Sequence, residues 1–225
     1  MDPLSTAWFS ALGAIILIDL VLAGDNAIVI ALAARRLPPE RRRQAVLWGT
    51  VGAVVVRAAM TLGVVWLLRL PGLMLAGGLG LVWIAWRLLA TPPADANAEP
   101  GATTFWGAMQ TIVVADALMG IDNVLGVAGA ANGSMDLVLI GLLLSVPIVV
   151  AGSAAVLRLI DRFPWLVTAG AAVLALTAAK MIVDEPLLDA VFDAHAFARY
   201  AAYAVVVTGV LWAGRRAAAA RAVQA

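Results

Sequence analysis

Long apolar runs alternate with short polar connections along nearly the whole chain. Each run is close to the length of about 20 residues that a helix needs to cross a bilayer. The runs cover residues 8–34, 45–68, 71–90, 105–131, 137–157, 164–183 and 199–214. This pattern predicts an all-α polytopic membrane protein with seven transmembrane helices.

The composition points to the same class of protein. Hydrophobic residues make up 64% of the 225 residues and the mean hydropathy is +0.99, whereas about half of the residues in soluble domains are apolar. The formal net charge of +1 gives no support for a nucleic-acid partner, and the lack of cysteine excludes disulfides and thiolate metal sites. The expected partner is the lipid bilayer, and both a monomer and a homo-oligomer are compatible with the sequence.

The basic residues predict the orientation of the chain. Five arginines follow the first apolar run, namely Arg35, Arg36, Arg41, Arg42 and Arg43. Because short cytoplasmic loops collect Lys and Arg, we expect the first helix to end in the cytoplasm. Seven spans from that start place the N-terminus outside and the C-terminus in the cytoplasm, in a bacterial-type inner membrane.

Two segments of the first half of the chain recur in the second half. The segment IILIDLVLAGDNAIVIALAA from Ile15 aligns without a gap with IVVADALMGIDNVLGVAGAA from Ile112. The aligned polar pairs are Asp19 with Asp116, Asp25 with Asp122 and Asn26 with Asn123. A second alignment matches Pro71 with Pro164 and Gly77 with Gly170. Because each repeat holds an odd number of spans, the second enters from the opposite side, which is the inverted arrangement of many secondary transporters.

The repeats divide the chain into four parts. Residues 1–90 are expected to form the first three-helix repeat, and residues 105–185 the second. Residues 91–104, rich in proline, alanine and acids, form a cytoplasmic linker between them. Residues 186–225 hold an outer acidic loop, the seventh helix and a basic cytoplasmic tail.

Four aspartates lie within the apolar runs, where charge is costly. A charged residue at the bilayer centre costs about 2.5–3.5 kcal/mol on insertion scales. Two carboxylates from each repeat can share a divalent cation, and oxygen ligands without thiolate or intramembrane histidine suit Mg²⁺, Ca²⁺ or Mn²⁺. The candidate metal ligands are Asp19, Asp25, Asn26, Asp116, Asp122 and Asn123. The alternative interpretation is that the carboxyls are protonated and hydrogen-bond between helices.

Several neighbouring residues bear on this site. Asp19 and Asp25 lie about 120° apart on a regular helix, so breaks at Gly24 and at Gly120 would help both acids to face inward. Arg57, a basic residue deep in a span, could pair with one of the acids or repel the cation and so help its release. Sulfur ligands such as Met119 and Met60 could shift the preference toward Mn²⁺.

Four stretches carry a family resemblance. They read LAGDNAIVIALAARRLPPE, LWGTVGAVVVRA, DALMGIDNVLGVAGAANG and FPWLVTAGAAVLALTAAKMIVDEP. The chain resembles the TerC family of integral membrane proteins, in its YjbE-like branch within the LysE superfamily of transporters. The resemblance implies that Asp25 with Asn26, and Asp122 with Asn123, are the two Asp-Asn motifs of the family. It also implies manganese efflux or, for the branch that names the family, tellurium resistance.

Two classes of function remain at this point. The first is a transporter that exports a divalent cation, with Mn²⁺ favoured, in which protons could compete for the same oxygens and be exchanged for the cation. Within transport, the alternative substrate is a small organic cation such as an amino acid. The other class is a non-transporting membrane scaffold linked to metal stress or tellurium resistance.

An enzyme is not expected. No zinc-binding pair of histidines and no Ser/His or Ser/Lys pair lies at membrane depth, since the single histidine, His195, falls in an outer polar segment. We therefore expect no catalytic residues and no permanently bound cofactor, with the divalent cation as transported substrate.

Overall fold

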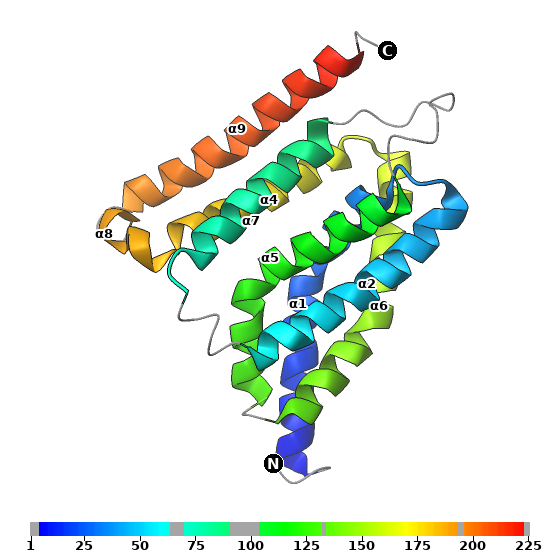
Figure 1. The fold of residues 1–225 in the computed structure, drawn as a ribbon, viewed down its shortest axis with the longest axis vertical. Coiled ribbons are helices and arrows are strands. Elements are labelled where there is room, and N and C mark those ends of the chain that lie inside the picture. Colours follow the sequence, from blue (N-terminus) through cyan, green and yellow to red (C-terminus); the bar gives the residue numbers. More distant parts are fainter. Residues whose placement is uncertain (1–4, 64–69, 91–103, 132–133, 193–195, 223–225) are drawn as a thin grey trace.

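The chain forms a bundle of long α-helices in the computed structural model, which describes residues 5–63, 70–90, 104–131, 134–192 and 196–222 (Figure 1). The long helices are α1 (Thr6–Ala34), α2 (Pro39–Leu62), α4 (Leu73–Ala90), α5 (Phe105–Ala131), α6 (Met135–Arg162), α7 (Leu166–Val183) and α9 (Ala196–Ala222). The short helices η1 (Pro186–Leu188) and α8 (Asp189–Phe192) connect α7 with α9. No strand occurs in the described ranges, so the predicted all-α class is confirmed.

Each of the seven predicted spans overlaps one long helix, although residues 64–68 of the second predicted span lie outside the described residues. Among the described residues, five helices are long and apolar enough to cross a membrane: α2, α4, α6, α7 and α9. Parts of α1 and α5 have side chains outside the described residues, so the count of seven spans stays a prediction. Residues 91–103 of the predicted linker, and His195, also lie outside the described residues.

Three helices extend beyond the apolar runs that predicted them. Helix α2 begins at Pro39, six residues before the predicted span, because proline is well placed at a first helical position and Glu40 lies in the first turn. Helices α6 and α9 continue through basic residues at their ends, including Arg162 and Arg216. Arginine is a good helix former, and hydropathy therefore marks the membrane-buried part of a helix rather than its ends.

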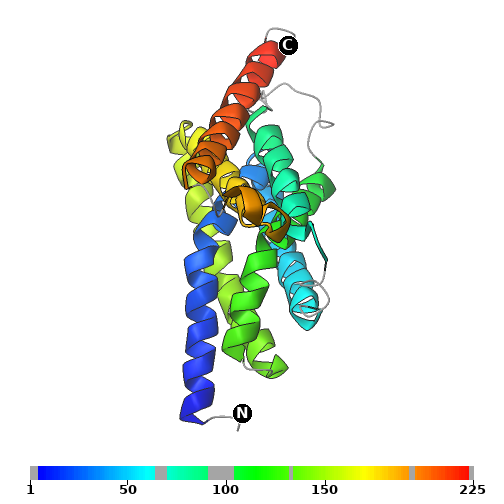
Figure 2. The same cartoon turned by 90° about the vertical axis from the view of Figure 1, so that its left-hand side faces the viewer.

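The helices pack in a recurring pattern. Helix α1 packs against α6, α2 against α5, and α4 against α7, while α9 lies along α4 and α7 (Figures 1 and 2). A Cβ atom on Gly141 of α6 would lie 2.5 Å from Cγ2 of Ile15 in α1. Similarly, a Cβ atom on Gly49 of α2 would lie 2.8 Å from Cδ1 of Ile112 in α5. A glycine thus admits the isoleucine of the neighbouring helix at both crossings.

Polar contacts join helix ends that are distant in sequence. At the start of α1, Trp8 Nε1 donates a 3.2 Å hydrogen bond to Asp136 at the start of α6. The start of α2 meets the end of α6 through an ion pair of 3.1 Å between Arg42 and Asp161. These contacts require α1 and α6 to run in the same direction, and α2 to run opposite to α6.

A buried carboxylate ties the start of α4 to the segment after α7. Glu185 is only 2% exposed, and its side chain accepts hydrogen bonds from the backbone N–H groups of Gly72 at 2.9 Å and Leu75 at 3.1 Å. Gly72 has a φ of 80°, a left-handed conformation that favours glycine. Glu185 thereby satisfies N–H groups that have no partner within the first turn of α4. The last residue of the predicted second repeat thus binds the start of a helix of the first.

Large apolar side chains cover the outside of the bundle. Exposed examples are Trp48, Val55, Leu62, Trp83, Trp106, Leu143, Trp165, Phe197, Val205 and Trp212. Soluble proteins rarely expose so many large apolar groups together, whereas a bilayer solvates them. The outer surface therefore agrees with the apolar helices in indicating an integral membrane protein.

Candidate functional site

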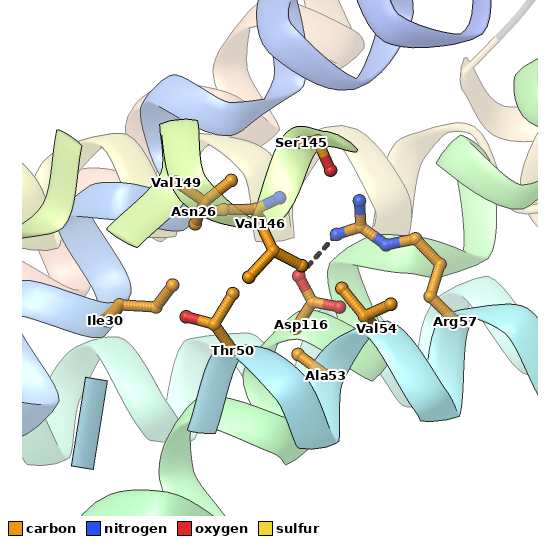
Figure 3. A pocket seen from close by; sticks show the side chains of 10 residues that line it. All are labelled: Asn26, Ile30, Thr50, Ala53, Val54, Arg57, Asp116, Ser145, Val146 and Val149. Atoms are coloured by element: carbon orange, nitrogen blue, oxygen red, sulfur yellow. Dashed lines mark hydrogen bonds and ion pairs between the residues drawn. The ribbon is translucent and has the colours of Figure 1, made fainter. Parts of the chain in front are cut away.

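Two buried charges within the apolar helices form an ion pair between α2 and α5. Arg57 is 5% exposed and Asp116 is 7% exposed, and Nη2 of the arginine donates a hydrogen bond to Oδ1 of the carboxylate (Figure 3). Removing one partner of a buried ion pair typically costs about 3–5 kcal/mol, because it leaves a charge without its counterion. Each side chain therefore makes the burial of the other tolerable.

The ion pair borders a small cavity among four helices. The cavity has a volume of about 20 Å³. Its lining comes from α1, α2, α5 and α6 and consists of Asn26, Ile30, Thr50, Ala53, Val54, Arg57, Asp116, Ser145, Val146 and Val149 (Figure 3). A cavity needs about 10–15 Å³ by this measure to hold one water molecule. The space therefore suits a single water-sized occupant.

Two buried oxygens at this cavity lack a hydrogen-bond partner among the described residues. They are Oδ1 of Asn26 and Oγ1 of Thr50, whose residues are 4% and 3% exposed. The hydroxyl of Thr61, farther along α2, donates a 2.8 Å bond to the carbonyl of Arg57. Thr50 makes no such bond to its own helix. Because buried polar groups are nearly always hydrogen-bonded, these two oxygens are suited to an occupant of the cavity.

The residues predicted from sequence are only partly brought together. Asn26 and Asp116 line the cavity, whereas Asp25 is half-buried and does not. Oδ1 of Asp25 instead accepts a 2.9 Å hydrogen bond from the backbone N–H of Asn26. The side chains of Asp19, Asp122 and Asn123 lie outside the described residues, and among the described ones no group of three His, Cys, Asp or Glu side chains could hold a metal.

Two secondary expectations can be compared with the structure. Helices α1 and α5 run without interruption through Gly24 and Gly120, because the backbone keeps its helical pattern at both residues. Met119 is 4% exposed and packs in the apolar core, not in the cavity lining. Met60 is half-buried and is also absent from that lining. Neither a broken helix nor a thioether therefore contributes to the cavity.

Thr50 and Ser145 were not anticipated from the sequence as cavity residues. Thr50 lies seven residues before Arg57, a spacing that places two side chains on the same face of a helix, and this was the available signal. Ser145 Oγ donates a 2.8 Å hydrogen bond to the Leu142 carbonyl of its own helix. Its position at the cavity depends on how α6 packs, which no local pattern reveals.

Comparison with known proteins gives a consistent picture. The profile described as "Integral membrane protein TerC family" matches residues 4–222. The uncharacterized membrane protein YjbE of Bacillus subtilis is 42% identical over 178 residues, which cover 79% of this chain and 81% of YjbE. The inner membrane protein YgdQ of Escherichia coli is 24% identical over 211 residues, covering 86% of this chain and 85% of YgdQ. No solved structure gives a significant match.

Proposed function

Because this chain belongs to the TerC family of integral membrane proteins, we propose that it is a transporter that exports a divalent metal cation, with Mn²⁺ as the favoured substrate. The single observation that carries the proposal is the cavity beside Asp116, where the Asn26 and Thr50 oxygens lack hydrogen-bond partners among the described residues. A carboxylate with neutral oxygen ligands is the donor set that hard divalent cations prefer.

The size of the cavity favours a metal ion over an organic cation. About 20 Å³ accommodates one water-sized occupant, whereas an amino acid would need a pocket many times larger. The lining also lacks an aromatic side chain that could bind an ammonium group. A dehydrated metal ion is therefore the better fit.

The packing supports an inverted repeat as the frame of the transporter. The first repeat contributes α1, α2 and α4, and the second α5, α6 and α7. The repeat relates α1 to α5 and α2 to α6. It therefore relates the pair of α1 and α6 to the pair of α5 and α2, and both pairs are closely packed. The two glycine–isoleucine contacts are related in the same way, since Ile15 and Ile112 are aligned positions. The parallel run of α1 and α6 agrees with a second repeat that enters from the opposite side.

Transport by the purified protein in proteoliposomes tests the proposal. We expect uptake of Mn²⁺ by the native protein and its loss in Asp116→Asn, while Asp161→Asn, which removes an exposed carboxylate from the Arg42 ion pair, stays native. Asp25→Asn and Asp122→Asn examine the two motif acids in the same assay.

Thr50→Val and Thr61→Val form a matched pair for the ligand role of the cavity. Both residues lie on α2 and are equally buried, but only the Thr61 hydroxyl is satisfied by its own helix. Thr50→Val should raise the KM for Mn²⁺ about tenfold, equivalent to roughly 1.4 kcal/mol of binding free energy, and Thr61→Val should not. Native protein that moves none of Mn²⁺, Ca²⁺ and Mg²⁺ would refute cation transport. Uptake of a cationic amino acid instead would favour the organic substrate.

A further inference from the structure

We propose that Arg57 takes the place of the transported cation at Asp116 whenever the site is empty, and that this exchange lets the empty transporter return across the membrane. The inference rests on the proposed transport function. It concerns the step of the cycle in which no cation is bound.

The geometry points to Arg57 as a built-in substitute for the cation. Its guanidinium reaches Asp116 from another helix, and Arg57 lines the same cavity as Asn26 and Thr50 (Figure 3). Arg57 comes from the first half of the chain and Asp116 from the second, so the ion pair bridges the two halves. Among the lining residues, Arg57 is the only basic one and Asp116 the only acidic one.

A cation and the Arg57 guanidinium cannot both occupy this site. The cavity has room for one water-sized occupant, and two positive charges at a single buried carboxylate repel each other strongly. Entry of a divalent cation must therefore displace Arg57 from Asp116. Departure of the cation allows the guanidinium to return, so that Asp116 is not left as a buried charge without a counterion.

This arrangement separates two kinds of transport. Net uptake requires the empty transporter to reorient, and that step needs Arg57 at Asp116. Exchange of labelled for unlabelled Mn²⁺ across the membrane passes only through cation-bound states. Loss of the Arg57 charge should therefore stop net uptake while exchange continues.

Arg57→Gln in proteoliposomes tests this separation. Net uptake is measured with no Mn²⁺ inside the vesicles, and exchange with an excess of unlabelled Mn²⁺ inside. We expect net uptake to fall on the order of a hundredfold to a few thousandfold, the size of effect that loss of one partner from a buried ion pair produces, with exchange near the native rate. Arg42→Gln is the matched control, because it makes the same change on α2 at an exposed ion pair and should leave both rates unchanged.

Arg57→Lys separates the charge from the packing of the side chain. A lysine retains the positive charge and should restore net uptake, whereas a structural role for the planar guanidinium would not be rescued. If Arg57→Gln does not yield folded protein, Arg57→Lys decides alone: retained net uptake supports the inference, and its loss overturns it.

The outcomes distinguish the two proposals. If the native protein moves no divalent cation in either assay, the proposed function fails. If the native protein transports Mn²⁺ but Arg57→Gln lowers net uptake and exchange equally, or lowers neither, the proposed function stands and the role of Arg57 at the empty site is wrong.

Discussion

Replacing Glu185 by glutamine should destabilise the protein far more than replacing its neighbour Asp184 by asparagine. The Glu185 carboxylate accepts backbone hydrogen bonds of 2.9 Å from Gly72 and 3.1 Å from Leu75, with a longer one of 3.4 Å from Leu187. Hydrogen bonds to charged groups contribute about 1.5–3 kcal/mol each. Glutamine keeps one acceptor oxygen but turns an NH₂ group toward a backbone donor, so we expect a loss of about 3 kcal/mol.

Asp184 provides the control for this prediction. Its carboxylate is half exposed and meets Arg199 at 3.6 Å, a surface ion pair that contributes about 0–1 kcal/mol. Thermal unfolding in detergent, followed by tryptophan fluorescence, should show a Tm roughly 10 °C lower for Glu185→Gln and a nearly native Tm for Asp184→Asn. Equal effects of the two variants would refute the reasoning.

The Glu185 carboxylate also predicts that the stability of the protein depends on pH. Glu185 follows the last residue of the apolar α7 helix by two positions and lies outside that span. Burial raises the pKa of Glu185, but hydrogen bonds from the backbone N–H groups, those of Gly72 and Leu75 first, outweigh it and hold the pKa below its usual 4.5. The carboxylate therefore stabilises the fold fully above pH 4.5, and this stabilisation is lost as the pH falls through the lowered pKa. The Tm difference between the native protein and Glu185→Gln should shrink in acid, and a difference independent of pH would contradict this account.

Two further predictions concern helix packing and the ion pair. Gly78→Ala should destabilise the protein by about 1–3 kcal/mol, because the new Cβ would lie 2.8 Å from the backbone carbonyl oxygen of Ala178. Gly209→Ala should instead stabilise the protein by up to about 1 kcal/mol, because its Cβ would have no atom within 4 Å. Thermal unfolding measures both effects. In a double-mutant cycle, Arg57→Met and Asp116→Leu should each lower the free energy of unfolding by about 3–5 kcal/mol, and the double variant should lower it by much less than the sum of the two. Additive losses would show that the two side chains are not coupled.

Hydropathy was sufficient to locate the long helices but not their ends. The apolar run from residue 105 to 131 matches α5 at both ends, because polar residues and linker flank it directly. Hydropathy predicts a loop for the arginines before residue 45, although Arg41, Arg42 and Arg43 lie within α2. A charged helical turn that leaves the membrane looks the same as a loop to a hydropathy pattern, because both are polar.

The candidate site depended on information that no single helix carries. Charge within an apolar run identified Asp116 and Arg57 as unusual, since such residues need compensation wherever they lie. Their pairing with each other required the crossing of α2 and α5, and the sequence left two roles open for Arg57. Thr50 is a candidate ligand only because its hydroxyl has no hydrogen-bond partner among the described residues. That is a property of the packed structure.

The position of α9 decides what a reporter group on this helix would measure. This helix packs along α4 and α7, apart from the four helices that line the cavity (Figure 1). A fluorophore attached near Trp212 would therefore follow the α4–α7 pair, and a second one on the exposed face of α2, near Trp48, would follow the cavity. Since the chain has no native cysteine, two introduced cysteines would suffice for energy-transfer measurements that detect any rocking of one group of helices against the other.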